Sequence, residues 1–113
     1  MNRLLVLLAG IALPWGAAAA NDFPTLERVE YVLGCARDAK GAAQENIYKC
    51  TCVIDALARK FTYDEYVEYS TAANAFSIGG ERGEVMRAYG VGKEMAGRFR
   101  TAQAEARQGC FLR

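Results

Sequence analysis

Four cysteines constrain the fold of this chain more than any other feature of its sequence. Cys50 and Cys52 lie two residues apart in a segment whose apolar residues recur at steps of three and four, the spacing of one helix face. These apolar residues are Ile47, Cys50, Ile54, Leu57 and Phe61. Cys52 lies about 200° around such a helix from Cys50, so the two sulfurs point to opposite sides. Because Cys35 precedes the segment and Cys110 follows it, the simplest architecture is a central helix tied to an earlier helix and to the end of the chain.

The first 20 residues have the pattern of a secretory signal peptide. Arg3 precedes an apolar run, Leu4 to Leu13, that is too short to span a membrane, and residues 17–20 are alanines that suit cleavage after Ala20. We therefore expect a signal peptide over 1–20 and one mature domain over 21–113. We also expect a periplasmic or secreted location, with no stable membrane anchor after cleavage. A retained anchor is the alternative interpretation.

Export makes two disulfides the expected state of an even set of four cysteines. A domain this small has a marginal core. The loop-entropy model assigns about 3 kcal/mol to a Cys35–Cys50 bridge and about 4 kcal/mol to a Cys52–Cys110 bridge. Counting outward from a turn near residue 42 or 43 brings Cys35 opposite Cys50, which favours this pairing. Cys35–Cys52 with Cys50–Cys110 remains open, whereas a Cys50–Cys52 bridge is excluded on a helix because the sulfurs diverge.

The rest of the mature chain is expected to be helical, since no run shows the alternation of a strand. We predict helices over about 25–37, 43–60, 63–75, 84–89 and 93–108. In the first, an apolar stripe is expected to face the core, and its members are Leu26, Val29, Val32, Leu33 and Ala36. Glu27 and Arg28 are expected to lie outside. The fold class is therefore all-α: a small bundle of four or five helices, or an orthogonal array of helices, closed by two disulfides.

Three features are expected to end or begin these helices. Thr62 and Glu65 fit a capping box at the start of the third helix. The stretch 76–83 contains three glycines and is expected to be a loop. Gly109 is expected to cap the last helix, just before Cys110.

The chain contains no histidine, which removes histidine-based catalytic triads, histidine zinc sites and covalent haem attachment. We predict no catalytic residue, no metal site and no cofactor. Cys50 and Cys52 could instead form a thiol-redox or copper(I) pair, since thiolates suit that ion. An acidic set could likewise hold a hard cation, although a capped and solvated helix face explains most of it: Asp55, Asp64, Glu65 and Glu68.

Two further sets of residues are candidates for binding. The segment Gly79, Gly80, Glu81, Arg82 and Gly83 could be a partner-binding loop, or only a tight turn between helices. Four tyrosines could line a groove for a small ligand, or pack in the core with their hydroxyls at the rim. They are Tyr48, Tyr63, Tyr66 and Tyr69. The basic residues of the last helix form no dense patch with interleaved aromatics, so we do not expect a nucleic-acid partner.

Three stretches of the chain resemble a family of small exported proteobacterial proteins with four cysteines. They are residues 44–55 (QENIYKCTCVID), 63–68 (YDEYVE) and 79–83 (GGERG). The family is associated with quinoprotein (PQQ-dependent) alcohol dehydrogenase systems, and Cys35 and Cys110 fall where its outer cysteines would be. The resemblance implies a periplasmic accessory role and carries over no catalytic residue. We therefore expect a non-enzymatic accessory protein that binds a periplasmic protein; thiol-redox or copper handling and small-ligand carriage are the alternatives.

Overall fold

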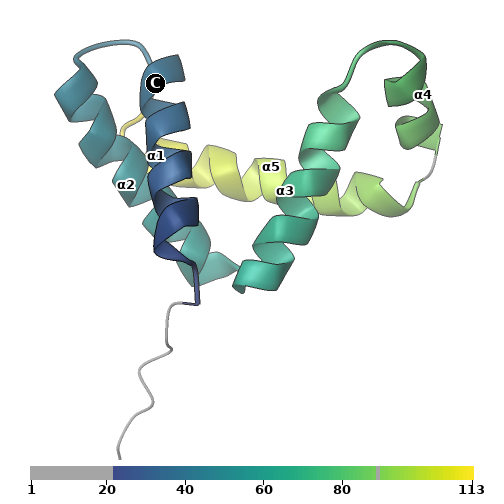
Figure 1. Ribbon diagram of the computed structural model, residues 1–113, viewed down its shortest axis with the longest axis horizontal. Helices are drawn as coiled ribbons and strands as arrows, with labels where there is room; N and C mark the ends of the chain where they lie inside the picture. The colour runs from purple at the N-terminus through teal and green to yellow at the C-terminus, as the bar shows by residue number, and fades with distance from the viewer. Residues whose placement is uncertain (1–21, 89) are drawn as a thin grey trace, which may run out of the picture.

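The computed structural model describes residues 22–88 and 90–113, apart from the side chains of residues 86 and 91. The predicted signal peptide lies outside these residues. Five helices are described: α1 (Thr25–Asp38), α2 (Ala43–Lys60), α3 (Tyr63–Ser77), α4 (Gly80–Ala88) and α5 (Val91–Gly109) (Figure 1). The described part of the chain contains no strand, so the all-α prediction is confirmed.

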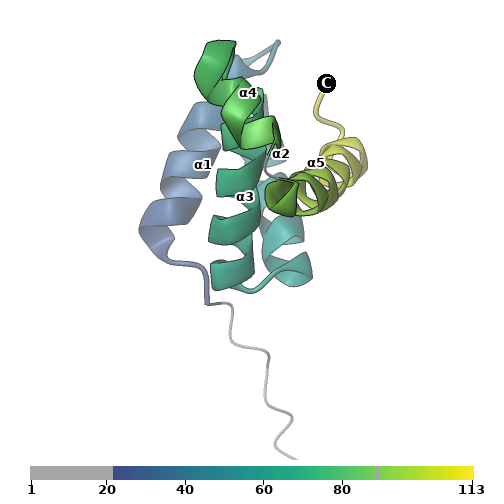
Figure 2. The same ribbon diagram turned by 90° about the vertical axis from the view of Figure 1, so that its right-hand side faces the viewer.

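The helices form an orthogonal array. α1 and α2 make an antiparallel hairpin, α3 and α4 form a second group that diverges from it, and α5 runs across both groups (Figure 1). In Figure 2, α1 lies on one side of the molecule and α5 on the other, with α2 and α3 between them. α5 packs mainly on α3 and α2. Among the described helices, α2 is the one whose backbone comes close to that of α1. No helix over residues 22–88 and 90–113 has the length and apolarity needed to cross a bilayer.

The core is built around α2, as its apolar face predicts. Cys50, Val53, Ile54 and Leu57 are almost completely buried. Burial of a Val, Ile or Leu side chain contributes about 1.5–3 kcal/mol. Small residues on α5, Ala96 and Ala102 among them, are also buried and allow that helix to approach closely.

An aromatic cluster joins the start of the described chain to α3 and α5. The ring of Tyr66 lies 4.9 Å from that of Phe23 and 5.8 Å from that of Phe99, between centroids. Phe61 and Tyr69 extend the cluster with an edge contact at 5.5 Å. Such tilted and edge-on pairs add to the burial of apolar area, so this cluster fixes α3 against α5.

The ends of two helices show how local sequence sets their bounds. The predicted capping box of α3 is confirmed: the Glu65 amide donates to Thr62 Oγ1 at 3.3 Å, and the Thr62 amide donates to Glu65 Oε2 at 2.9 Å. Gly109 does not cap α5 as predicted, because it is the last helical residue. The left-handed position falls on Phe111, at φ 57°, and the amides of Phe111 and Leu112 donate back to the carbonyls of Gln108 and Arg107.

The loop predicted over 76–83 is wrong in extent. α3 continues to Ser77 and α4 begins at Gly80, so only two residues connect the helices. Two glycines make this tight corner possible. Gly80 has a φ of +74°, which is unfavourable for other residues, and Gly83 is buried against the carbonyl of Ile78.

Gly83→Ala is expected to lower the free energy of unfolding by about 1–3 kcal/mol, the usual cost of overpacking. A Cβ at this position would lie 1.8 Å from the Ile78 carbonyl oxygen, so the backbone of α4 would have to move. Urea denaturation followed by circular dichroism measures the change. Gly79→Ala is the matched control, because its Cβ would meet no atom within 4 Å. Equal effects of the two changes would contradict the close-packing role of Gly83.

Candidate functional site

The two disulfides are Cys35–Cys50 and Cys52–Cys110, with Cα atoms 6.0 Å and 5.8 Å apart. This is the favoured pairing, and it confirms that the two sulfurs leave α2 in different directions. All four cysteines lie in the described residues, and none is free. In this state Cys50 and Cys52 offer no thiolate, the form that acts as a nucleophile or a copper ligand.

The segment predicted to bind a partner, 79–83, is part of the corner between α3 and α4. Glu81 and Arg82 lie in the first turn of α4 and are exposed. Ile78 and Val85 are exposed beside Arg82 and make a small apolar patch with it. The segment is therefore a helix start with charged, accessible side chains rather than a loop.

The structure does not bring the four candidate tyrosines together. Tyr63, Tyr66 and Tyr69 belong to the aromatic cluster, whereas Tyr48 is exposed on α2. Burial raises the pKa of the Tyr66 hydroxyl above its ordinary value, and the neighbouring Glu27 carboxylate raises it further. Tyr66 is therefore a core residue, and Tyr63 and Tyr69 pack against the core half-buried.

Two of the four acidic candidates are engaged in structural contacts, and Asp64 and Glu68 are exposed on α3. Asp55 accepts a hydrogen bond from Arg28 at 2.5 Å, and Glu65 belongs to the capping box. Over residues 22–88 and 90–113, no group of three or more Asp, Glu, Cys or His side chains is placed to hold a metal ion.

The most unusual surface lies on α1, where the predicted inward stripe is wrong in part. Leu26, Val29 and Leu33 are 67%, 47% and 61% exposed, and α1 contains no buried residue. We call these three residues the α1 stripe. They follow one another at three- and four-residue steps, so they lie on one face of the helix, and that face points to solvent.

α1 packs against the core through Val32 and Ala36, as predicted, and also through side chains that were predicted to lie outside. The hydroxyl of Tyr63 donates to Glu27 at 3.3 Å, and Arg28 pairs with Asp55. The Arg28 guanidinium also lies 5.7 Å from the centre of the Phe23 ring. These polar contacts fix the rotation of α1 about its axis, and that rotation turns the stripe outward.

An apolar groove of about 260 Å³ runs between α1 and α2, next to the stripe. Val29, Val32 and Leu33 line it from α1, and Thr51 and Ile54 line it from α2. The Thr51 hydroxyl donates to the Ile47 carbonyl at 2.8 Å within its own helix, so its polar group is already satisfied.

Charged side chains stand at the edges of this groove. The Arg28–Asp55 pair lies along it, and the Asp55 side chain keeps 44% of its surface exposed. Glu30 is exposed on α1 beside Leu26 and Leu33, on the far side of the stripe from the groove, and it forms no ion pair with the described residues. The groove is therefore an apolar strip with the Arg28–Asp55 pair along it.

The sequence carried no signal for this outward rotation. The apolar positions of α1 fall in a single arc with the ordinary width of a core-facing stripe. Comparisons of the chain with protein-family models, with curated proteins and with solved structures give no significant match.

Proposed function

We propose that this protein is a non-enzymatic accessory protein that binds a helical segment of another protein in the groove between α1 and α2. The observation that carries the proposal is the exposure of the α1 stripe, three large aliphatic side chains in register on one helix face. Single exposed apolar residues are ordinary. A row of them along a groove is a feature of surfaces that bind proteins.

The shape of the groove favours a helix as its occupant. Two antiparallel helices leave a straight apolar channel, which accepts the apolar face of a third helix through anchors spaced three and four residues apart. Leu26 and Leu33 lie two turns apart and would contact successive anchors of such a helix. Covering the stripe removes apolar surface from water, at about 25 cal/mol for each Å².

Charge supports a partner helix with basic flanks. Glu30 is exposed beside Leu26 and Leu33 of the stripe, and Asp55 lines the groove, where it pairs with Arg28 and keeps 44% of its side chain exposed. Lysine or arginine residues on either side of the partner's apolar face would lie opposite these groups. Such complementarity sets orientation and specificity more than affinity.

Two disulfides support an oxidising, extracytoplasmic location for this function. More specifically, we propose that the protein is located in the periplasm after cleavage of a signal peptide, residues 1–20. The resemblance of residues 44–55, 63–68 and 79–83 to exported quinoprotein-associated proteins supports a partner from a periplasmic alcohol-oxidation system. Under this proposal the protein holds or positions its partner and performs no chemistry itself.

The experiment is site-specific photo-crosslinking in the source periplasm, with benzoylphenylalanine in place of Leu33. We expect one dominant product, whose crosslinked peptide comes from an amphipathic helix with basic flanks. A synthetic copy of that peptide should bind the purified protein. The double variant Val29→Asp/Leu33→Asp should bind it at least about tenfold more weakly, since a charge would enter an apolar contact.

Three controls make this result decisive. Benzoylphenylalanine in place of Val85, an exposed residue of α4, should not give the same product. The double variant should unfold within about 0.5 kcal/mol per site of the wild type, as exposed positions do. Glu81→Ala/Arg82→Ala should leave peptide binding unchanged; if it alone abolishes binding, the 79–83 segment is the docking surface instead. A product formed with a second copy of this chain would also contradict the proposal.

A further inference from the structure

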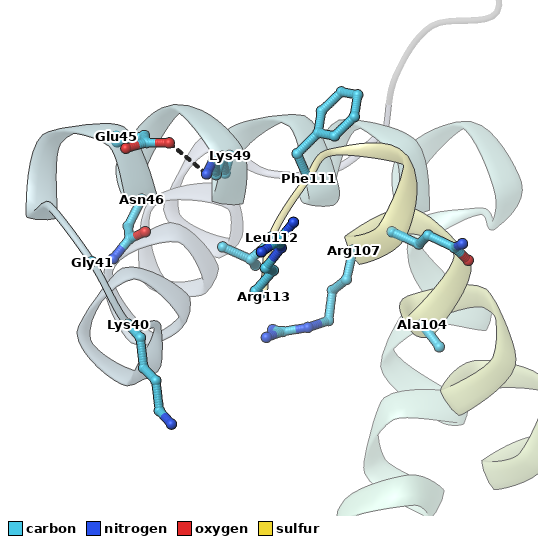
Figure 3. Close-up of a pocket in the computed structure, with 11 residues that line it drawn as sticks. Lys40, Gly41, Glu45, Asn46, Lys49, Ala104, Arg107, Phe111, Leu112 and Arg113 are labelled. Atoms are coloured by element: carbon cyan, nitrogen blue, oxygen red, sulfur yellow. Dashed lines mark ion pairs between the residues drawn. The ribbon is translucent and has the colours of Figure 1, made fainter.

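A second hollow lies at the opposite end of the hairpin from Arg28. It has a volume of about 960 Å³ and is enclosed by the α1–α2 turn, the first turns of α2 and the end of α5 (Figure 3). We call it the basic pocket, because four of its lining residues are Lys40, Lys49, Arg107 and Arg113. Its size is within the range of small-molecule sites.

The charge of the basic pocket is not balanced by its acidic side chains. Glu45 is the one Asp or Glu side chain among the lining residues, and it pairs with Lys49, which lowers the pKa of the Glu45 carboxyl. Lys40, Arg107 and Arg113 form no ion pair with an Asp or Glu of residues 22–88 and 90–113. The lining therefore carries an excess of positive charge on a concave surface, which concentrates the electrostatic field and attracts anions.

The wall that carries Lys40 is held in place by a buried amide. Asn46 is the one buried polar residue in the described part of the chain, and its Nδ2 donates to the Ala39 carbonyl at 3.2 Å. Gly41, with a φ of +109°, completes the turn between these residues. The position of Lys40 relative to α2 is therefore fixed by a hydrogen bond and a glycine turn.

The opposite wall is held by a disulfide and a strained residue. Cys110 is bonded to Cys52, and Leu112 is buried, so the residue between them has little freedom. That residue, Phe111, adopts a φ of 57° and is 80% exposed. A bulky side chain in this backbone region is uncommon, and such outliers cluster at functional sites.

Figure 3 shows how these walls present their side chains. Arg107 and Arg113 extend into the space between the hairpin and the end of α5, and Lys40 stands across it. The Phe111 ring points away from the basic groups, at the outer edge. Cations from three separate segments therefore face one space, which is the arrangement needed to bind an anion with several oxygens.

We propose that the basic pocket binds a small polyanion through its phosphate or carboxylate groups, with Arg107 and Lys40 as principal contacts. Arginine forms paired hydrogen bonds with either group, and lysine adds a point charge. The site is separate from the α1–α2 groove, so it does not depend on the proposed function. The anion could be a free metabolite or the headgroup of a lipid, since both present the same oxygens.

Titration calorimetry at low ionic strength tests the site, with inorganic pyrophosphate and citrate as separate probes. We expect binding to the wild type that weakens as salt is added. Arg107→Gln/Lys40→Gln should lose about tenfold or more in affinity, the result of removing charge-assisted hydrogen bonds. Sedimentation with vesicles containing an anionic phospholipid forms the second arm, and a loss in the same variant would identify a headgroup as the source.

The matched control removes one arginine and one lysine charge at positions outside the basic pocket. Arg82→Gln/Lys93→Gln lies outside the pocket and should retain at least half of the wild-type affinity in either arm. The circular dichroism spectra and melting temperatures of both variants should match those of the wild type. Three of the four side chains are exposed, Arg107 is half-buried, and none of the four forms an ion pair with the described residues. The proposal is overturned if the wild type binds neither probe and no anionic vesicle, or if the two variants lose affinity equally.

Discussion

Replacing Cys52 and Cys110 together by alanine is expected to lower the free energy of unfolding by about 2–5 kcal/mol. The bridge closes a sequence separation of 58 residues, so its loss restores much conformational freedom to the unfolded chain. It also releases the last residues of the chain, where Cys110 and Leu112 are buried against the core. Total stability in a small domain is roughly 5–10 kcal/mol, so this loss would leave the fold marginal.

Urea denaturation of the double variant, followed by the circular dichroism signal of its helices, measures the change in the free energy of unfolding. Cys35→Ala/Cys50→Ala is the comparison. Its bridge spans a separation of only 15 residues, but Cys50 has no exposed surface, so its replacement also leaves a cavity. An unchanged unfolding midpoint for Cys52→Ala/Cys110→Ala would show that the C-terminal tie does not stabilise the native fold.

The second large effect is expected at Leu57. Its side chain has no exposed surface and lies at the centre of the α2 core, so Leu57→Ala should cost about 2–5 kcal/mol. The cost combines lost apolar burial with the cavity that remains. Thermal and urea unfolding of Leu57→Ala measure this loss of stability.

Leu33→Ala is the matched control, because it removes the same atoms from a side chain that is 61% exposed. We expect this change to alter stability by less than about 0.5 kcal/mol. A large loss at Leu33 would mean that the α1 stripe is part of the core in solution. The proposed docking groove would then have to be abandoned, so this pair of variants also tests the surface on which the proposed function rests.

Most of the fold could be predicted from local pattern. The apolar repeat of α2 indicates where that helix begins and ends, and the Thr62 capping box indicates where α3 begins. Helix geometry excluded a Cys50–Cys52 bridge, and counting outward from the α1–α2 turn favoured Cys35–Cys50 over Cys35–Cys52 without deciding between them. These features depend on residues close in sequence, where periodicity and capping chemistry decide the outcome.

The predictions that proved wrong concern features determined by contacts between residues far apart in the sequence. The rotation of α1 depends on Arg28 meeting Asp55 and on Glu27 meeting Tyr63, and neither contact can be deduced from the spacing of α1 alone. The glycines near residue 80 indicated a loop, whereas one of them supplies a turn and another a close approach between helices.

The basic pocket was likewise hidden, since Lys40 and Arg107 are far apart in the sequence. Gly109 was an obvious candidate for the left-handed cap, yet that position falls two residues later, on Phe111. The Cys52–Cys110 bond and the burial of Leu112 fix the end of the chain on either side of it. Tertiary constraint therefore overrides the preference for glycine at this position.

The two bridges that meet on α2 have a consequence for survival among extracytoplasmic proteases. Cys52–Cys110 encloses the end of α2 and all of α3, α4 and α5 in one covalent ring, and Cys35–Cys50 encloses the turn between α1 and α2 in another. A single peptide-bond cut inside either ring opens the ring but releases no fragment. The nicked chain remains one molecule with its termini held near their original places, so a cut at the exposed α3–α4 corner leaves α1, α2 and the C-terminal segment connected.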